Sequence, residues 1–381
     1  MAQHTIKRMG LILIPFVLLV FCYIVRQSVP FSFGESLDYW HFIHRLKTSD
    51  KHDAEGVFIN MAYDNALCDF HPYTDADGER IDLYKGNVCI TDRKALIDLL
   101  TSIKNNNSYK YVILDIRFEE GTNTPYDSTL FNLIASMRDI VIPSHQGMIL
   151  GPQKLQPISA LADFRSTISN IGFTKMQFLQ RDGESIPLKL YSDLTDNCIK
   201  KVGPFYFDKG RLCANSLFIH IPDFQTDKTQ RPYYDYGPEI ATEKGFFSSE
   251  ERFKDKIIVI GDFVNDCTGT YNGIQANPRL LFLSASALLD GNHLYSIWFI
   301  LTIYLVYSIA TLYVFYGHRW ALTKWLEKHK VTYFLVCFLI FNNFFYLIGA
   351  GLFMATSYTI STFIPSTAFS VLRSFSDIWN K

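Results

Sequence analysis

The sequence predicts a mixed α/β protein: a three-layer sandwich with a mostly parallel central sheet, joined to four transmembrane α-helices. Uncharged apolar runs stand near both ends of the 381 residues. Between them, short apolar runs alternate with amphipathic segments, as expected for parallel strands covered on both faces. The chain is 48% hydrophobic, which excludes a disordered protein, and its net charge of −1 excludes a strongly basic nucleic-acid binder.

The first apolar run, 9–25, follows the basic residues Lys7 and Arg8 and contains no charge. Its length is at the short end for a membrane-spanning helix. A cleaved signal peptide begins in the same way. Here, however, Arg26 follows the apolar run, and the sequence after it contains no cleavage site made of small residues. We therefore expect a cytoplasmic N-terminus over 1–8 and an uncleaved transmembrane helix over 9–26.

Three further transmembrane helices are expected over 294–316, 331–352 and 355–373. The last is rich in hydroxyl groups, which lower the cost of insertion by bonding back to the helix backbone. Some of them form a helical stripe suited to helix–helix contact, namely Thr359, Thr362, Ser366 and Ser370. Pro365 is expected to kink this helix. The alternative is that this segment is a buried or interfacial helix.

The basic residues predict the topology. The loop 317–330 has four Lys or Arg residues against one Glu, so we place it in the cytoplasm, together with the tail 374–381. The body, 27–293, has 35 acidic residues against 27 Lys and Arg residues and falls on the opposite side. We expect a multi-pass protein of the bacterial inner membrane, with an extracytoplasmic body and both termini cytoplasmic.

Within the body, strand-like runs are found at 57–63, 111–116, 139–143, 171–176, 186–191, 216–222 and 256–261. The first, second and last are almost continuously apolar and predict central parallel strands. Helices are predicted over 92–104, 128–138 and 281–290, the last ending at Gly291. This alternating order implies right-handed crossovers. Turn-rich strands over 160–230 predict an antiparallel extension, and 223–250 a long surface loop.

Several stretches of the body are similar to one family. The strand 57–64 ends in Asp64, and 94–120 is a helix followed by a strand that ends in aspartate. RDG stands at 181–183, and 253–273 is followed by the helix 281–293. Together with the membrane plan, these stretches resemble the CHASE2 family of extracytoplasmic sensor domains. The chain departs from the family over 86–96, where GNVCITDRKAL replaces a Trp-Pro-x-x-Arg stretch.

The resemblance implies a sensor domain held by one N-terminal and three C-terminal transmembrane helices. Many relatives continue into a signalling output domain, whereas this sequence ends at Lys381, shortly after the last predicted span. We therefore expect the signal to leave through partner proteins. The resemblance does not say which ones.

The candidate ligand-binding residues are Asp64, Asp115, Arg117, Asp262 and Asp266. Three of the aspartates follow the ends of predicted parallel strands, where open α/β sheets bind ligands. Arg117 is placed to pair with a carboxylate or to clamp an anion. The alternative is structural: these carboxylates cap helices and accept hydrogen bonds from loop amides.

Five of the seven cysteines lie in the body. An extracytoplasmic location permits disulfides, and the local pairs are Cys68–Cys89 and Cys198–Cys213. Cys267 would then remain unpaired. The spacing of Cys and His residues does not indicate a metal site, and we expect none.

The motifs of common hydrolases and nucleotide-binding enzymes are absent, so we expect no enzyme and no cofactor. The first hypothesis is a sensor or receptor-like subunit that binds a small molecule or an envelope protein. The alternative is a structural subunit of a larger envelope complex, and a membrane-tethered hydrolase is a third. The expected partners are the bilayer and other membrane or envelope proteins, with a homo-oligomer left open and nucleic acid excluded.

Overall fold

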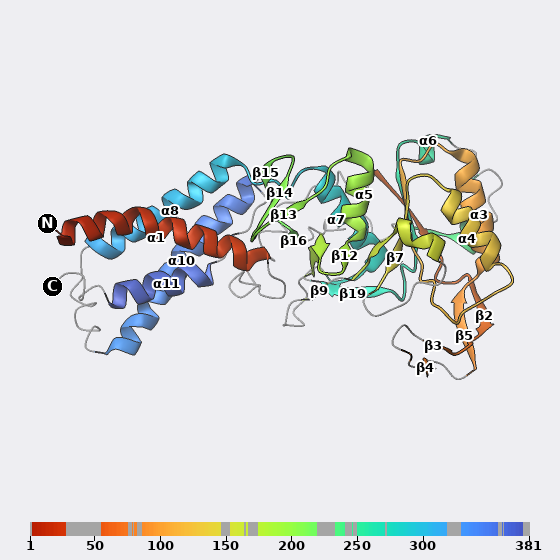
Figure 1. Ribbon diagram of the computed structural model, residues 1–381, viewed down its shortest axis with the longest axis horizontal. Helices are drawn as coiled ribbons and strands as arrows, with labels where there is room; N and C mark the ends of the chain where they lie inside the picture. Colours follow the sequence, from red (N-terminus) through yellow and green to blue (C-terminus); the bar gives the residue numbers. More distant parts are fainter. Residues whose placement is uncertain are drawn as a thin grey trace.

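The computed structural model describes residues 2–27, 55–74, 78, 80–81, 86–145, 153–163, 165–166, 174–218, 233–240, 246, 250–270, 273–317, 329–356, 360 and 362–375. An α/β domain and a bundle of helices lie at opposite ends of an elongated molecule (Figure 1). Segments from both ends of the sequence form the bundle.

The centre of the domain is a six-stranded parallel sheet with the order β17–β1–β18–β6–β7–β8. Its middle strands are the apolar runs that the sequence singles out as central, and their side chains are almost wholly buried. The mixed α/β class and the parallel sheet are thereby confirmed. The strands are β1 (Gly56–Asn60), β6 (Tyr111–Asp115), β7 (Ile140–Ser144), β8 (Ser159–Leu161), β17 (Tyr234–Asp235) and β18 (Ile257–Gly261).

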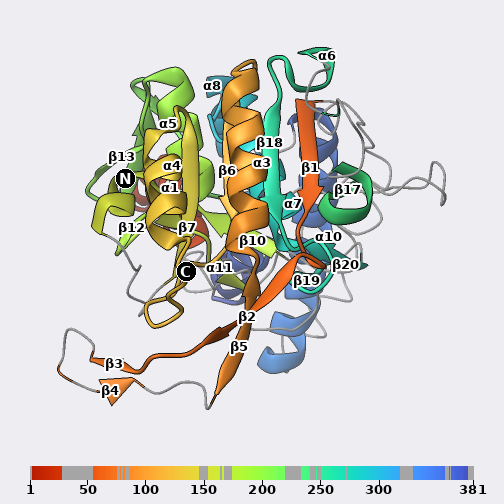
Figure 2. The ribbon, with the colours of Figure 1, turned by 90° about the vertical axis from the view of Figure 1, so that its right-hand side faces the viewer.

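Helices cover both faces of the sheet (Figure 2). On one face, α3 (Arg93–Asn106) and α4 (Asp127–Ser136) pack Leu96 and Leu130 into one apolar core, with the short α6 (Glu250–Phe253) beside them. On the other face, α5 (Ile186–Thr195) and α7 (Asn277–Leu289) contribute to a second core. Asp92 caps α3 as its sequence predicts, because its carboxylate accepts a hydrogen bond from Lys94 N at 2.8 Å.

Smaller antiparallel sheets extend the domain, as expected for the region after residue 160. One is β9 (Arg165–Ser166), β10 (Thr174–Gln177) and β16 (Ser216–Phe218); another is β13 (Lys200–Val202), β14 (Phe205–Asp208) and β15 (Arg211–Leu212). Two hairpins are β11 (Leu179–Gln180) with β12 (Gly183–Glu184), and β19 (Cys267–Thr270) with β20 (Gly273–Ala276). Single helical turns lie at η2 (Gln153–Ile158) and η3 (Tyr236–Ile240). Most of the expected surface loop 223–250 lies outside the described residues. The prediction is wrong for its described part, because β17 pairs with β1 in the central sheet and Ile240 and Phe246 are buried.

A two-stranded arm projects from the domain (Figure 2). It consists of β2 (Asn65–Asp69) and β5 (Asn87–Thr91), with the short pair β3 (Tyr73–Thr74) and β4 (Arg80–Ile81) beyond them. The sequence does not predict this arm, because each of its strands has only three consecutive apolar residues between polar ends.

The strand predicted over 186–191 is wrong, because this segment forms the helix α5. Ile186, Leu188 and Leu190 alternate as in a strand, and all three are buried between the sheet and α7. The local signals favour a helix, since the Ser185 hydroxyl accepts a hydrogen bond from Leu188 N and Pro187 stands in the first turn.

The bundle consists of α1 (Ala2–Gln27), α8 (Ile297–Tyr316), α10 (Lys330–Thr356) and α11 (Phe363–Ser374). Among the described residues, two helical segments are long and apolar enough to cross a membrane, Ile297–Tyr316 and Lys330–Leu352. They coincide with two of the four predicted spans. The apolar part of α1, Met9–Val25, is shorter.

The last predicted span, 355–373, is wrong as a single helix. α10 continues to Thr356, and α11 begins only at Phe363 and has 12 residues. At 1.5 Å per residue, α11 is about 18 Å long, well short of the ~30 Å hydrocarbon layer. Pro365 does not kink a long helix, because it lies in the first turn of α11.

The hydroxyl stripe of α11 is buried, as its predicted role in helix packing requires. Thr362, Ser366 and Ser370 are at most 1% exposed, and α11 packs against α10 and α8. The Ser370 hydroxyl donates a hydrogen bond to the carbonyl of Ser366 at 2.6 Å. Thr359 lies outside the described residues.

Both expected disulfides are wrong, because all seven cysteines are free. Cys68 pairs in register with Val88, whereas Cys89 pairs with Leu67. Neighbouring positions on a strand face opposite sides, so Cys68 is buried and Cys89 is exposed. Cys198 is also exposed, whereas Cys213 is buried at the end of the domain nearest the bundle.

Candidate functional site

The carboxyl ends of β1, β18 and β6 lie side by side at one edge of the sheet. Asn60 is in register with Gly261, and Gly261 with Asp115. Asp64, Asp115 and Asp262 therefore follow neighbouring strands, at the edge where open α/β sheets bind ligands. Among the described residues, no group of three or more His, Cys, Asp or Glu side chains is arranged to hold a metal ion.

Asp262 has the structural role that the sequence leaves open as the alternative. Its Oδ1 accepts hydrogen bonds from the amides of Val264 and Asn265 at 2.8 and 2.7 Å, and its Oδ2 accepts one from Asn265 Nδ2 at 2.9 Å. The carboxylate therefore fixes the turn after β18.

Asp64 joins the loop after β1 to the start of η3. Its Oδ2 accepts a hydrogen bond from Gly237 N at 3.3 Å, and a Cβ at Gly237 would lie 2.6 Å from Oδ1. The close approach requires glycine. Burial raises the pKa of Asp64 and the Gly237 amide lowers it, while the charges of Asp92 and Asp235 raise it further.

Three of the predicted aspartates are linked by charge, because Asp266 acts on Asp115 and Asp262 acts on Asp266. Burial, and then the charge of Asp266, raise the pKa of Asp115 to about 8. Burial also raises the pKa of Asp266, whereas the hydrogen bond from Asn277 Nδ2, at 2.6 Å, lowers it. Asp115 therefore holds a proton near neutral pH and acts there as a neutral carboxylic acid.

Arg117 forms a local ion pair with Glu119, two residues further on. Its side chain is 43% exposed. The five predicted residues thus share one edge of the sheet, but they divide into a turn, a helix cap, an acidic pair and a local ion pair.

Asn60 is a buried residue of this edge whose structural role the sequence does not reveal. It ends β1 with no exposed surface, and its Nδ2 donates a hydrogen bond to Asp235 Oδ1 at 2.6 Å. Its Oδ1 accepts hydrogen bonds from the amides of Ala62 and Phe263. One amide side chain therefore ties together the segments at the ends of β1, β17 and β18. The only signal was a polar residue ending an apolar strand.

Arg93 is a second residue that the sequence does not reveal. It is the first residue of α3 and is only 2% exposed, with its guanidinium 4.6 Å from the centre of the Phe118 ring. It lines a polar pocket between α3, α4 and the loop after β6. Burial lowers the pKa of Arg93, and the nearby charge of Asp127 raises it.

A second region of interest is the contact between the bundle and the domain. The segment Leu212–Asn215, here called the junction strand, receives the end of α1. The Tyr23 hydroxyl donates a hydrogen bond to the carbonyl of Cys213 at 2.9 Å. It also accepts one from Tyr206 N at 2.9 Å, and Gln27 Oε1 accepts one from Asn215 N at 2.7 Å.

The chain that enters α8 holds the junction strand as well. Tyr295 N donates a hydrogen bond to the carbonyl of Leu212 at 3.0 Å, and Ala214 N donates one to the carbonyl of His293 at 2.8 Å. Cys213 and Leu294 form the bridge between these two. The junction strand is therefore hydrogen-bonded to α1 through Cys213 and Asn215, and to the segment leading into α8 through Leu212 and Ala214.

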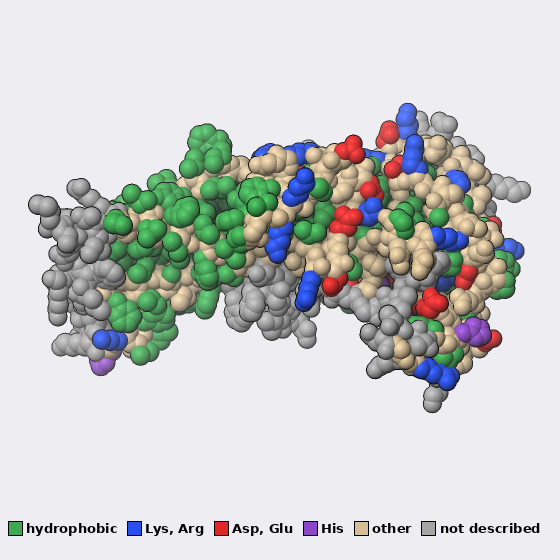
Figure 3. Space-filling view, viewed as in Figure 1, with side chains coloured by type: hydrophobic (Ala, Val, Ile, Leu, Met, Phe, Trp, Pro, Cys, Tyr) green, Lys and Arg blue, Asp and Glu red, His purple; other side chains and the backbone are tan. Residues whose placement is uncertain are grey.

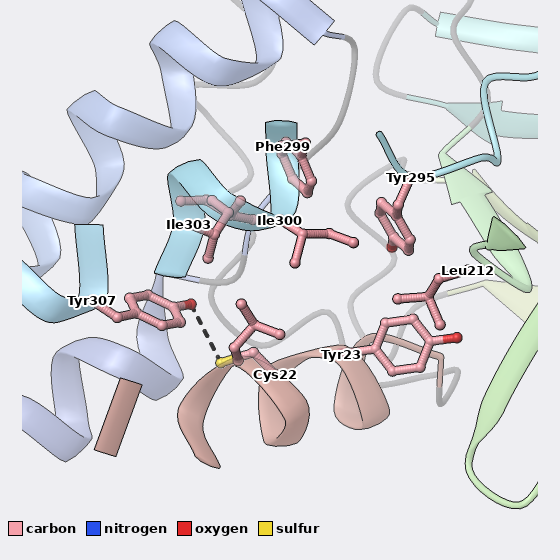
Figure 4. Close-up of a pocket in the computed structure, with 10 residues that line it drawn as sticks. Cys22, Tyr23, Leu212, Tyr295, Phe299, Ile300, Ile303 and Tyr307 are labelled. Atoms are coloured by element: carbon pink, nitrogen blue, oxygen red, sulfur yellow. Dashed lines mark hydrogen bonds between the residues drawn. The ribbon is translucent and has the colours of Figure 1, made fainter. Parts of the chain in front are cut away.

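An apolar pocket opens beside the junction strand (Figure 4). It has about 500 Å³ of empty space, its open mouth included, between α1, α8 and the domain. Tyr23 and Tyr295 point into this region, and the Tyr307 hydroxyl donates to Cys22 Sγ at 3.6 Å. The remaining lining residues are Leu19, Leu212, Phe299, Ile300, Ile303 and Ile360.

A buried polar group lies directly behind the junction strand. Asp208 Oδ2 accepts a hydrogen bond from the Tyr191 hydroxyl at 2.6 Å and lies 3.0 Å from His293 Nε2. Asp208 and His293 are at most 1% exposed. Burial lowers the pKa of His293, and the bond to Asp208 opposes this shift. The junction is therefore polar and fully enclosed on its domain side.

No protein-family model, curated protein or solved structure matches this chain.

Proposed function

We propose that this protein is a receptor-like subunit of the bacterial inner membrane. Its extracytoplasmic α/β domain binds a small molecule or an envelope protein, and the junction strand passes the state of the domain to the helices and on to partner proteins. The observation that carries the proposal is the double attachment of the junction strand, through Tyr23 and Gln27 to α1 and through Tyr295 to the segment entering α8.

The surface of the bundle supports a membrane location. Figure 3 shows mostly hydrophobic side chains over the described surface of the helices and charged side chains over the domain. Large apolar residues project outward on each long helix, among them Ile12, Trp298, Leu305 and Leu339. Soluble monomers rarely expose large apolar side chains in one contiguous patch. We propose α1, α8 and α10 as spans, with α11 packed among them.

The arrangement of the helix ends supports termini on one side. At the far end of the bundle, a Cβ at Gly10 would lie 3.2 Å from the Phe315 ring, so the start of α1 meets the end of α8. Arg373, near the end of α11, donates hydrogen bonds to Val314 O and Gly317 O at 2.9 and 3.2 Å. The basic residues around these ends favour the cytoplasm.

The hydrogen bonds at the junction support a coupling role. The Tyr23 hydroxyl both donates a hydrogen bond to one backbone group of the domain and accepts a hydrogen bond from another. A shift of α1 along its axis therefore breaks these bonds or moves β14 and the junction strand with it. A ligand changes this equilibrium only if it binds one arrangement more tightly than the other. The resemblance to CHASE2 sensors is consistent with this proposal and is part of it.

The location is tested with a membrane-impermeant maleimide on intact cells. Cys89 and Cys198 are exposed on the domain. Variants that retain one of these thiols, with the other cysteines replaced by serine or alanine, should be labelled without cell lysis. Labelling of both thiols only after lysis would place the domain in the cytoplasm and overturn the proposal.

The signalling role is tested by photo-crosslinking in the native cell. A photoreactive residue at Leu305 of α8 or Leu339 of α10, both outward-facing, should trap the same membrane-embedded signalling protein. The Tyr23→Phe variant should change the yield of this adduct, whereas Tyr63→Phe, at an exposed site on the domain, should not. If Tyr23→Phe gave the same adduct yield as the parent chain, this result would refute coupling through the junction.

The projecting arm favours the alternative, a structural subunit of an envelope complex. Leu67 on β2 is 73% exposed, and its cross-strand partner Cys89 on β5 is exposed as well. An exposed apolar pair on a narrow arm is suited to contact with another protein. If Leu67→Lys abolishes co-purification of envelope proteins while Tyr23→Phe has no effect, scaffolding is favoured over sensing.

A further inference from the structure

We propose that the pocket between the start of α3 and the loop after β6 binds a small molecule carrying both a carboxylate and an ammonium group, as a free amino acid does. This inference deepens the proposed sensing function by naming the class of ligand, and it rests on that function only for the ligand's role. The polar lining consists of Arg93, Glu119, Glu120, Thr122, Asn123 and Asp127.

Arg93 supplies a positive charge with unused hydrogen-bond donors. Its Nε and Nη1 are buried and have no hydrogen-bond partner among the described residues. The carboxylate oxygen Asp127 Oδ1 lies 3.7 Å from Nε, which is too long for a hydrogen bond. Leaving buried donors of a charged group unsatisfied is costly, so an anionic group in this pocket would be stabilised.

Asp127 is already occupied by other donors. Its Oδ1 accepts a hydrogen bond from the Thr124 hydroxyl at 2.7 Å, and its Oδ2 accepts one from Thr124 N at 3.0 Å. Asp127 therefore reduces the electrostatic cost of the buried Arg93 without satisfying its N–H groups. The guanidinium is held in place by Phe118 beneath it and remains available to a planar carboxylate.

The two glutamates of the pocket indicate that the ligand also carries a positive charge. Glu119 is engaged by Arg117, whereas Glu120 has no hydrogen bond or ion pair among the residues that the structure describes. Glu120 and Asp127 oppose a multiply charged anion such as phosphate, because like charges in one pocket repel. A ligand that brings one carboxylate to Arg93 and one ammonium group to Glu120 matches both charges.

The pocket is suited to a ligand in size and in place. Its volume is about 220 Å³, and it lies beyond the carboxyl end of β6. This volume is below the roughly 300–1,000 Å³ of pockets that bind drug-sized molecules, as suits a ligand as small as an amino acid. The edge of the sheet at which the pocket lies is the usual place for ligand sites in α/β sheets.

The arm fixes the wall of the pocket. His71 N donates a hydrogen bond to Gly121 O at 2.9 Å, and Cys68 Sγ donates one to Asn123 O at 3.4 Å. Gly121 has a φ of +88°, and a Cβ there would lie 2.6 Å from His71 O. The loop is therefore pre-formed, which reduces the entropy cost of binding.

The test is isothermal titration calorimetry on the full chain in detergent micelles. The twenty proteinogenic L-amino acids are added singly at millimolar concentration. At least one should give a saturable heat, and its analogues lacking the carboxylate or the amino group should bind about tenfold or more weakly. Saturable binding that needs only one of the two charges overturns the proposal, as does the absence of binding by all twenty.

Two variants assign the binding to this pocket. Glu120→Gln changes a half-buried side chain without a partner and should weaken binding by about tenfold, as should Arg93→Lys. Glu184→Gln, on the hairpin β11–β12, is the matched control and should bind as the parent chain does. If Arg93→Lys does not fold, Glu120→Gln decides alone, and unchanged affinity in that variant overturns the site.

The outcomes for the site and for the function are distinguishable. Calorimetry measures binding without any response of the helices. Saturable binding with no change in the crosslinking from α8 or α10 would leave the site intact and remove the sensing function. A Tyr23-dependent adduct without amino-acid binding would support the sensing function and refute the amino-acid site.

Discussion

The hydroxyl of Tyr23 and the carbonyl of Cys213, 190 positions apart in the chain, form a buried hydrogen bond of 2.9 Å. The same hydroxyl accepts a hydrogen bond from Tyr206 N. One side chain at the end of α1 therefore completes the backbone hydrogen bonding of two segments of the domain.

Tyr23→Phe should lower the free energy of unfolding by about 1–3 kcal/mol, because it leaves a buried amide and a buried carbonyl unsatisfied. Hydrogen exchange should quicken at the Tyr206 amide, which is measured by mass spectrometry on the solubilised chain. The control is Tyr63→Phe, whose side chain is 62% exposed and which should change neither quantity. Unchanged exchange at Tyr206 in the Tyr23 variant would contradict the role assigned to the junction.

Asp115 should make the domain less stable as the pH rises. Its pKa is about 8 in the folded chain, above the ~3.9 expected when unfolded, so its contribution is complete below about pH 4 and is lost through pH 8. Asp115→Asn removes this titration and should raise stability at pH 8.5 by about 2 kcal/mol, with little gain at pH 5. Melting temperatures across this range check the result, with Asp69→Asn, at an exposed position on the arm, as the control. Equal shifts at both pH values would refute the assignment.

His293 should impose the opposite dependence at lower pH. Burial lowers its pKa in the folded chain, so the unfolded chain takes up a proton below about pH 6.5 and stability falls as the pH decreases. His293→Gln should flatten the curve of melting temperature against pH below 6.5. His71→Gln, at an exposed position, should leave the slope unchanged. The assignment fails if both variants retain the parental slope.

The free cysteines should differ sharply in reactivity. Brief treatment of the folded chain with iodoacetamide should modify Cys89 and Cys198, which are exposed, and should spare the buried Cys68 and Cys213. Burial also raises the pKa of the Cys68 and Cys213 thiols, which lowers their thiolate content. Peptide mass spectrometry measures the modification, and denatured protein is the control. Detection of a Cys68–Cys89 disulfide peptide would contradict the register of β2 and β5.

Arg373 should stabilise the bundle by capping α8. It is 5% exposed and donates hydrogen bonds to the carbonyls of Tyr313, Val314 and Gly317 at the end of α8. The Tyr313 carbonyl also accepts the Gly317 amide, but the carbonyls that end a helix otherwise lack helical partners. Arg373→Met should lower the free energy of unfolding by about 1–3 kcal/mol, and Arg373→Lys should restore part of it. Thermal denaturation in detergent measures the effect. Arg138→Met, at an exposed site in the domain, is the control, and an equal loss in both variants would argue against the cap.

Elements with one dominant local signal could be predicted from the sequence. The runs at 111–116 and 256–261 are apolar on both faces, which places them at the centre of a parallel sheet, and the Asp92 cap marks the start of α3. The segment 186–191 has two competing signals. Its alternating apolar residues match a strand, but Ser185 and Pro187 favour a helix, and the helix buries all of those residues at once.

The candidate site was predictable only as an edge of the sheet. Asp64, Asp115 and Asp262 lie where their strands end, because strand order places the ends together, but their partners are distant in sequence. The burial of Arg93 depends on Phe118, and the role of Asn60 depends on Asp235, 175 positions later. Long-range side-chain contacts of this kind leave no trace in local periodicity.

Because β18 lies between β1 and β6, the central sheet can be completed only after β18 has been synthesised. The two earlier strands, β1 and β6, form no hydrogen bonds with one another, because β18 lies between them. Residues Ile257–Gly261 of β18 are synthesised only shortly before α8. Nascent chains that still lack this strand hold two unfinished parts of the sheet with bare edges, which are prone to aggregation. The sheet is therefore completed late in synthesis, just before the helices that follow β18 in the chain.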